Sequence, residues 1–296
     1  MKKTSEEVRI WGAKLKLAHF MEVLDKTTIE NWILPYLTVG QRGKDITVAM
    51  TDLMDAILYK LKTGCQWREL PVKQFFEGGK LTWQGVYYHF NEWRKDGSWK
   101  RVWLNVLRLN KRFLDLSSIQ LDGSHSLAKN GGQAVGYQGR KAAKTTTSLF
   151  MADNSGVMLA CATPQAGNHH DLFEIEPLFE ELCVLLESAS INLKGLFLNA
   201  DSGFDAQNLR LACERRDIQA NIAANPRRAT PQTSEWTYFD EELYKRRTVI
   251  EHANAWLDSF KTLLVRYETN VENWLSFHWL AFVVLFLRRI NKRKKA

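Results

Sequence analysis

The stretch TTSLFMADNSGVMLACAT, residues 146–163, determines which kind of fold the chain can adopt. Its two short apolar runs, 146–152 and 157–163, predict buried strands. The four residues between these runs, DNSG, are typical of a hairpin turn. The sequence therefore predicts an antiparallel pair of strands near the middle of the chain.

Further strands and helices are predicted on both sides of this hairpin. One apolar run before it, 118–121, and two after it, 195–200 and 219–223, indicate three more strands. Apolar residues at helical spacing predict helices at 171–188, 205–216 and 242–264. Three consecutive strands followed by alternating helices and strands predict an α/β fold, a mixed sheet with flanking helices. This is the element order of an RNase H-like domain.

The chain before this part is helical in pattern and rich in aromatic residues. Helices are expected at 47–62, 81–96 and 99–113, and the second carries Arg94 and Lys95 at its basic end. Helix, turn and aromatic helix favour a helix-turn-helix DNA-binding unit over the alternative, a small helical bundle with a solvated basic face.

We therefore predict two domains, an all-α DNA-binding domain over 1–116 and the α/β domain over 117–296. The net charge of +8 supports a polyanionic partner. Residues 42–112 hold 14 Lys and Arg against 7 Asp and Glu, a net charge of +7. The last nine residues add six cations and no acid, and the alternative for this tail is a solvated, frayed terminus.

The cysteines and the apolar runs indicate the compartment. The four cysteines form no CxxC pair and no zinc-binding spacing, so buried thiols in a reducing compartment are expected. The N-terminus lacks a signal-peptide core, and the longest apolar run, Trp279–Leu287, is too short to span a bilayer. A cytoplasmic protein without a membrane partner is predicted.

Three carboxylates are the candidate chemical groups. Asp122 and Asp201 each follow an apolar strand, where ligands bind in open α/β sheets, although either residue alone could be a turn or cap residue. On the last helix, Tyr244, Arg247 and Glu251 share one stripe, for which a solvated charged face is the alternative.

Carboxylate oxygens suit Mg²⁺ or Mn²⁺, and two such ions in one site catalyse phosphoryl transfer without a protein nucleophile. A two-carboxylate glycosidase is an alternative on the carboxylates alone, but it does not explain the basic N-terminal segment.

The sequence resembles a known family in several separate stretches. QLDGSHS (120–126), GYQGRKAAKTT (136–146), GNHHDL (167–172), NADSGFD (199–205) and YKRRTVIEHANAWLDSFKTLLVRYE (244–268) resemble DDE transposases of the insertion-sequence family numbered five, within the wider group numbered four. The resemblance extends from about Leu34 to Phe286 and includes a DNA-binding region. It implies that Asp122, Asp201 and Glu251 are the catalytic metal ligands. Tyr244 and Arg247 match the Tyr and Arg of the family's Tyr-Arg-Glu-Lys signature, which contacts DNA.

One position departs from that signature, because Asp258 stands where the family has Lys. Lys261, one turn further on, is the candidate substitute for this DNA-phosphate contact. His170 and Asp171 match a recurrent His-Asp pair of the family and are candidates to support the metal ligands. A helix cap is the alternative for Asp171. Zinc binding by the histidines would need a matching Cys or His spacing, which the sequence lacks. Three more candidates for phosphate contacts are Arg140, Lys141 and Lys144. The alternative is that they are solvent-exposed loop residues without a DNA contact.

The resemblance implies a DNA transposase that cleaves insertion-sequence ends and transfers the strands into target DNA. The expected partners are double-stranded DNA, as terminal inverted repeats and target, and further copies of the chain in a homodimer or larger assembly. Cytoplasmic, nucleoid-associated action is expected. Two other functions stay open: a transposase-derived, sequence-specific DNA-binding protein, and a DNA nuclease without strand transfer.

Overall fold

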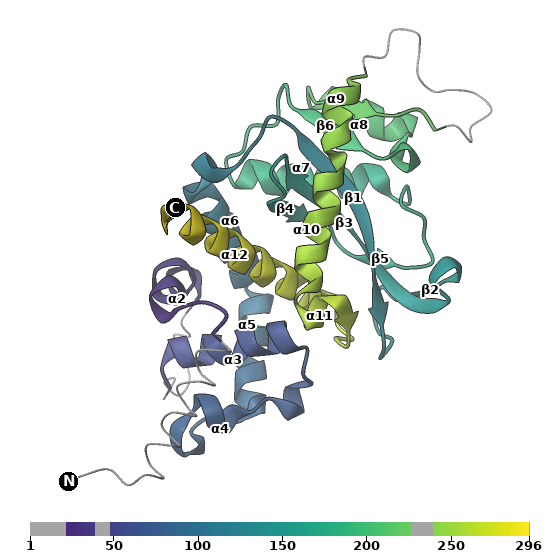
Figure 1. Ribbon diagram of the computed structural model, residues 1–296. Helices are drawn as coiled ribbons and strands as arrows, with labels where there is room; N and C mark the ends of the chain where they lie inside the picture. Colours follow the sequence, from purple (N-terminus) through teal and green to yellow (C-terminus); the bar gives the residue numbers. More distant parts are fainter. Residues whose placement is uncertain (1–21, 39–47, 226–238, 296) are drawn as a thin grey trace.

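The computed structural model describes residues 22–38, 48–225 and 239–295. The N-terminal helices lie beside a sheet built by the rest of the chain, and a C-terminal helix packs among them (Figure 1). Thr47, the predicted start of the first helix, lies outside the described residues. The N-terminal helices are α2 (Lys26–Trp32), α3 (Met50–Thr63), α4 (Val72–Phe75), α5 (Trp83–Lys95) and α6 (Ser98–Leu109), with 3-10 turns at Leu34–Tyr36, Trp67–Glu69, Glu77–Gly79 and Lys111–Phe113.

The predicted N-terminal helices are confirmed as α3, α5 and α6. Gly64, at φ 67°, ends α3, and its N–H donates to the Lys60 carbonyl at 2.9 Å. Glycine suits this left-handed conformation because it has no Cβ. A Cβ at Gly64 would lie 3.0 Å from Lys261, so glycine also allows a later segment to approach α3 closely.

A mixed sheet forms the second part of the molecule. Its strands are β1 (Ile119–Ala128), β2 (Gly136–Gln138), β3 (Ala143–Asp153), β4 (Met158–Cys161), β5 (Gln165–Ala166), β6 (Phe197–Ala200), β7 (Gln219–Ile222) and β8 (Val265–Arg266). β1 pairs antiparallel with β3 and parallel with β6, which pairs parallel with β7. β4 pairs with β3 after the DNSG turn, which confirms the predicted hairpin. The order β4-β3-β1-β6-β7 is RNase H-like and confirms the predicted fold class.

Helices cover both faces of this sheet. They are α7 (Ile175–Ser188), α8 (Gln207–Arg215), α9 (Glu241–Lys245), α10 (Val249–Asp258), α11 (Lys261–Leu264) and α12 (Val271–Lys295). Asp122 of β1 contacts α10, whereas the next residue, Gly123, faces Asp171 and Phe204. Because successive strand residues point to opposite faces, α10 and the segments at 171 and 204 lie on different sides of β1.

Two predicted element ends are wrong. β1 does not end at Leu121 but continues to Ala128, because its polar residues keep pairing with β3 as far as Leu127. α7 does not begin at Asp171 but at Ile175. The N-cap residue is Glu174, which adopts a left-handed conformation and makes no side-chain capping hydrogen bond, so the helix-cap alternative for Asp171 is wrong.

The predicted helix over 242–264 is also interrupted. A 3-10 turn at Arg246–Thr248 separates α9 from α10, and α10 ends at Asp258. Phe260 is buried with an extended backbone, and there the chain turns into α11. This turn brings α11 against α3 and allows β8 to pair with β1, contacts that a straight helix would not reach.

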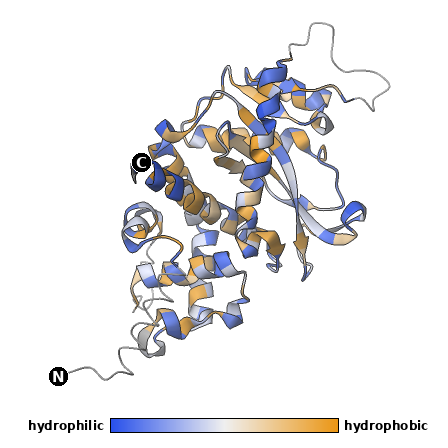
Figure 2. Cartoon of the chain, in the orientation of Figure 1, coloured by the Kyte–Doolittle hydropathy of each residue, from blue (hydrophilic) through white to orange (hydrophobic). Residues whose placement is uncertain are grey.

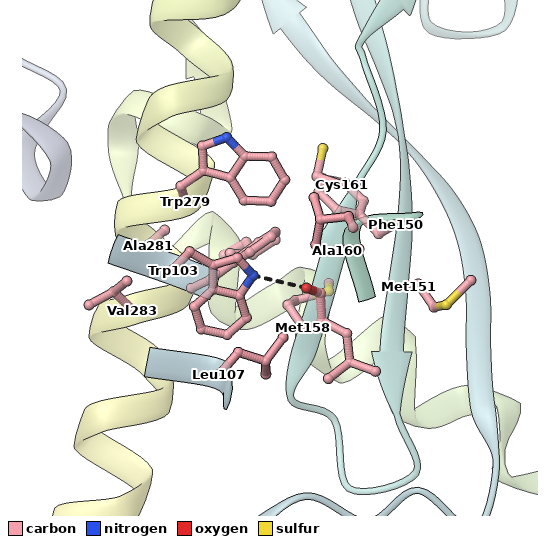
Figure 3. Packing of buried hydrophobic residues seen from close by; sticks show 14 of the residues in the cluster. Trp103, Leu107, Phe150, Met151, Met158, Ala160, Cys161, Trp279, Ala281 and Val283 are labelled. Atoms are coloured by element: carbon pink, nitrogen blue, oxygen red, sulfur yellow. Dashed lines mark hydrogen bonds between the residues drawn. The ribbon is translucent and has the colours of Figure 1, made fainter. Parts of the chain in front are cut away.

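The C-terminal helix shares the core of the N-terminal helices. α12 packs on α6, α5 and α3, and the run Trp279–Leu287 lies inside it, as predicted for a core helix. Trp103 of α6 is fully buried, donates from Nε1 to the Leu159 carbonyl at 2.9 Å, and packs edge-on against Phe282 (Figure 3). The apolar centre of α12 and its hydrophilic end are separate in Figure 2. One hydrophobic core therefore joins the N-terminal helices and α12 to the sheet.

A buried ion pair makes a second connection between the same parts. Lys60 of α3 lies 3.3 Å from Glu268, and both side chains are at most 9% exposed. Trp67 donates to the same carboxylate at 3.0 Å, and the Lys60 ammonium lies 5.4 Å from the Trp67 and Phe277 ring centres. A buried pair with these partners fixes geometry more than it adds net stability.

The basic tail belongs to α12 and is largely anchored. Arg288, Arg289 and Arg293 donate to the backbone carbonyls of residues 23, 155 and 113, so the frayed-terminus interpretation is wrong for these arginines. Cys161, Cys183 and Cys213 are free and buried, as expected, whereas Cys65 is half-buried. Within the described ranges, none of the helices has the length and apolar character needed to cross a membrane.

Asp55 of α3 provides a test of stability against pH. Burial raises its pKa from 3.8 to about 6, so the folded chain keeps a proton that the unfolded chain releases. Stability should therefore fall as pH rises from about 4 to 6 and remain lower above that. Asp55→Asn should raise the free energy of unfolding by about 1 kcal/mol at pH 7.5 and leave it unchanged at pH 4.

Urea unfolding at both pH values measures this difference. The matched control is Asp52→Asn, which removes an exposed 2.8 Å ion pair with Lys26 and should slightly lower stability at pH 7.5. Equal effects of the two substitutions at pH 7.5 would contradict the prediction.

Candidate active site

The two predicted strand aspartates lie level with each other on neighbouring strands. Gln120 of β1 is paired with Asn199 of parallel β6. Asp122 lies two residues after Gln120, and Asp201 lies two residues after Asn199. Asp122 lies within β1, so its interpretation as a turn residue is wrong. Asp201 follows β6 and also caps a 3-10 turn, Ser202–Phe204, accepting the Gly203 N–H at 2.7 Å.

The environment of Asp122 is unfavourable for a lone negative charge. Burial, aided by the charges of Asp201 and Asp171, raises its pKa from 3.8 to about 7. The Gly123 N–H and the charge of Arg247 act in the opposite direction. A desolvated carboxyl close to two other acids is a site that a cation would stabilise.

Glu251 lies on α10, one turn before a residue that contacts Asp122. Asn254 donates from Nδ2 to Asp122 Oδ2 at 3.0 Å, and residues three apart share a helix face. The Glu251 side chain is 54% exposed, and its Oε1 lies 3.1 Å from Arg247 Nη1. Tyr244 is half-buried on α9, in the same stripe. The structure thus brings α10 to Asp122 through Asn254, and it pairs Glu251 with Arg247.

The oxygen donors of Asp122, Asp201 and Glu251 fit a hard divalent cation. Across residues 22–38, 48–225 and 239–295, no three His, Cys, Asp or Glu side chains converge closely enough to enclose a metal ion. The aspartates meet the requirement for adjacent acids, whereas Glu251 forms its ion pair with Arg247.

Only one member of the predicted His-Asp pair reaches the site. Asp171 Oδ1 lies 3.9 Å from His125 Nε2 and 3.0 Å from the point where Gly123 would carry a Cβ. A side chain at position 123 would displace Asp171, so glycine permits this approach. His170 is exposed, and its Nδ1 accepts the Leu172 N–H at 3.1 Å, which is a local turn contact.

Sequence reasoning missed Asn254, Gly123 and His125. Asn254 could have been found, since it continues the Tyr244, Arg247 and Glu251 stripe at helical spacing. Gly123 and His125 lie on the opposite face of β1 from Asp122, and only the bend of the 165–171 segment brings Asp171 to them.

The predicted phosphate contacts near the site lie on one projecting hairpin. Arg140, Lys141 and Lys144 are exposed on the β2–β3 hairpin, and no acid occurs between Asp122 and Asp153. Lys141 also donates to the His125 carbonyl at 3.0 Å.

Lys261, the predicted substitute for the family's Lys, differs in position from the prediction. Burial raises the pKa of Asp258, while the charges of Lys141 and Lys261 lower it, so this acid lies among these cations. Lys261 does not continue the Glu251 stripe, because it begins α11 after the extended Phe260.

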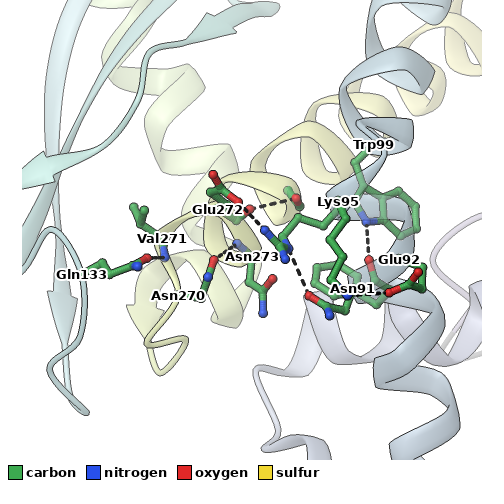
Figure 4. A network of polar contacts seen from close by, with 12 residues as sticks. Asn91, Glu92, Lys95, Trp99, Gln133, Asn270, Val271, Glu272 and Asn273 are labelled. Carbon is green, nitrogen blue, oxygen red and sulfur yellow. Dashed lines mark hydrogen bonds and ion pairs between the residues drawn. The ribbon is translucent and has the colours of Figure 1, made fainter.

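Arg94 and Lys95, at the end of α5, both have acidic partners. Arg94 forms an ion pair with Glu272 of α12, and its side chain is only 15% exposed to solvent. Lys95 pairs with Glu92 at 2.7 Å within α5 (Figure 4). The Arg94–Glu272 pair fastens α5 to α12, and both pairs partly neutralise the basic end of α5.

Two family models match consecutive parts of the chain. The family model for the transposase DDE domain matches residues 108–286, and the IS4/5-family transposase model DUF4096 matches residues 29–103. No curated protein matches the sequence. Among solved structures, the chain is similar to the piggyBac transposase synaptic complex with hairpin DNA, at 10% identity and TM-score 0.46, covering 95% of this chain and 76% of that one. It is also similar to the Mos1 transposase paired-end complex, at 14% identity and TM-score 0.28, covering 88% of each chain.

The strand order and the carboxylates beside β1 define a protein of the RNase H-like class. The match over residues 108–286 is more specific: the chain belongs to the transposase DDE domain family and is a DNA transposase of the IS4/IS5 kind. This domain implies dependence on a divalent metal and action on DNA.

Proposed function

We propose that this transposase cleaves DNA at the ends of an insertion sequence and joins them to target DNA, using Asp122, Asp201 and Glu251. The observation that carries the proposal is the level placement of Asp122 and Asp201 on parallel neighbouring strands. The α10 stripe supports it, because Glu251 lies one turn from the residue bonded to Asp122.

The three carboxylates would hold Mg²⁺ or Mn²⁺, with two ions per active site. Bound ions of this kind activate the attacking oxygen and stabilise the leaving oxygen. The chain's own contribution is placement: the sheet register fixes the two aspartates, and the Gly203 N–H orients Asp201. Arg247 supplies a positive charge beside Glu251 that DNA phosphate could also use.

We assign terminal inverted repeat recognition to the helical part within 1–116 and catalysis to 117–296. The charged and aromatic side chains proposed to contact DNA near the active site are Tyr244, Arg247, Lys261, Arg140, Lys141 and Lys144. Arg94 and Lys95 would have to exchange their acidic partners for phosphate, so they are weaker contacts. Two DNA ends require two active sites, so a homodimer or larger assembly is proposed, acting on nucleoid DNA in the cytoplasm.

Incubating the full chain with its own element ends and Mg²⁺ or Mn²⁺ tests this function. Cleavage of the ends and joining of precut ends to target DNA are the expected products. Cleavage without joined product would identify a nuclease instead. Specific binding without either product would identify a DNA-binding protein that has lost its activity.

The hairpin cations are expected to contribute measurably to DNA affinity. Replacing Arg140 and Lys144 together with Ala should weaken DNA binding because both are exposed and no acid offsets them. The slope of log affinity against log salt should become less negative by about 1.8, or about 0.9 for each lost phosphate contact. Binding titrations at several salt concentrations measure this slope.

Lys194→Ala is the matched control for the hairpin, since Lys194 is an exposed cation before β6, at the opposite end of that strand from Asp201. It should leave the slope unchanged. An unchanged slope in the double variant would remove the hairpin from the DNA-binding surface.

A further inference from the structure

Asn254 has an unusual combination of contacts for a residue on a helix surface. Its Nδ2 donates to Asp122 Oδ2 at 3.0 Å. Its Oδ1 is buried and has no hydrogen-bond partner among the described residues. Both atoms belong to one small planar amide, so the unpartnered oxygen lies beside the same carboxylate.

The orientation of this amide is fixed by chemistry. As a metal ligand Asp122 is ionised and only accepts hydrogen bonds, so the NH₂ group of Asn254 must face it. A buried carbonyl without a partner is costly, and in native proteins such groups call for a functional explanation.

The neutral charge of Asn254 also suits its place. An acid there would add a further negative charge to the one that Asp201 and Asp171 already exert on Asp122. A lysine or arginine there would neutralise Asp122 and compete with a divalent cation. An amide is the group that can restrain the carboxylate and still leave its charge available.

We propose that Asn254 is a positioning residue for the metal ligands. Its Nδ2 restrains the Asp122 carboxylate in the orientation that receives a divalent cation, and its buried Oδ1 accepts a hydrogen bond from water in the loaded site. This inference rests on the proposed function of Asp122. It adds a residue that touches neither cation nor DNA and acts through the Asp122 ligand and through site water.

Cation binding by the full-length protein without DNA tests this role independently of activity. Titration with Tb³⁺, followed by its luminescence, reports the affinity of Asn254→Ala against that of the unaltered chain. Loss of the restraint should weaken cation binding about 10-fold or more, as for other partners of metal ligands. The thermal midpoint without cation should stay equal or rise, because the unpartnered carbonyl is gone. The concentration of Mn²⁺ needed for half-maximal cleavage should rise similarly.

Two further variants make the test specific. Asn254→Asp should bind Tb³⁺ more tightly than the unaltered chain but have a lower thermal midpoint without cation, because it adds a negative charge beside Asp122. Asn105→Ala is the matched control, since Asn105 is a half-buried helical amide whose two ends are both bonded within α6. It should leave Tb³⁺ affinity unchanged.

Unaltered Tb³⁺ affinity and Mn²⁺ dependence in Asn254→Ala would overturn the positioning role. A drop in its thermal midpoint that matches any loss of affinity would also overturn it, since it would show a purely structural role. These outcomes are separable from failure of the proposed function, which would appear as retained cleavage in Asp122→Asn.

Discussion

Asp122→Asn is expected to abolish DNA cleavage, lowering its rate by about a thousandfold or more. Removing a charged ligand takes away several kcal/mol of transition-state stabilisation, and each 1.36 kcal/mol corresponds to a factor of ten. The same substitution should raise the thermal midpoint of the metal-free protein. It removes a buried carboxylate that lies near Asp201 and Asp171, whose charges oppose its ionisation.

Asp201→Asn and Glu251→Gln should abolish cleavage to a similar extent, and all three variants should keep their affinity for element ends. Glu251→Gln should not raise the thermal midpoint, because its carboxylate is half exposed and already paired with Arg247. Single-turnover cleavage and thermal melting in the presence of a chelator measure both effects. Cleavage near the original rate in any variant would exclude that residue from the catalytic set.

Trp103→Ala is expected to have the largest effect on stability, lowering the free energy of unfolding by about 3 to 5 kcal/mol. The indole is fully buried between α12 and β4, and its Nε1 bonds to the Leu159 carbonyl at 2.9 Å. Its loss opens a cavity and leaves that carbonyl without its indole donor. Because total stability is commonly about 5 to 15 kcal/mol, much of the protein could be unfolded near 37 °C.

Denaturant unfolding monitored by circular dichroism measures this loss. Leu109→Ala is the control, because Leu109 is 53% exposed on the same helix and should change stability by less than about 0.5 kcal/mol. If the helical part and the sheet unfolded in separate transitions, the continuous core described here would be contradicted. A single transition at lower denaturant is the expected result.

Much of the fold could be predicted from the sequence because its signals are local. The hairpin, the buried strands at β6 and β7, and the helices α3, α5 and α6 follow from apolar spacing and turn residues. The exceptions depend on contacts between distant segments. β1 extends beyond its apolar part because β3 continues alongside it, and α10 ends at Asp258 because Phe260 is buried and β8 pairs with β1.

The candidate site was predictable in part for the same reason. Asp122, Asp201 and Glu251 could be selected from strand ends, helix spacing and family resemblance. In the structure the two aspartates lie at the same level of the neighbouring strands β1 and β6. Their catalytic role stays a prediction. The Arg247–Glu251 ion pair and the approach of Asp171 to Gly123 depend on side-chain packing in three dimensions, which residue spacing does not encode.

The position of α12 has a consequence for how the protein is made. Helices α3, α5 and α6 are synthesised early, yet the apolar surface that completes their core lies in residues 271–295, near the end of the chain. During translation these helices emerge before α12, so Trp103 and its neighbours lack their packing partner until α12 has left the ribosome. A chain that stops before residue 271 would lack α12, so its exposed core would make it a substrate for chaperones and proteases.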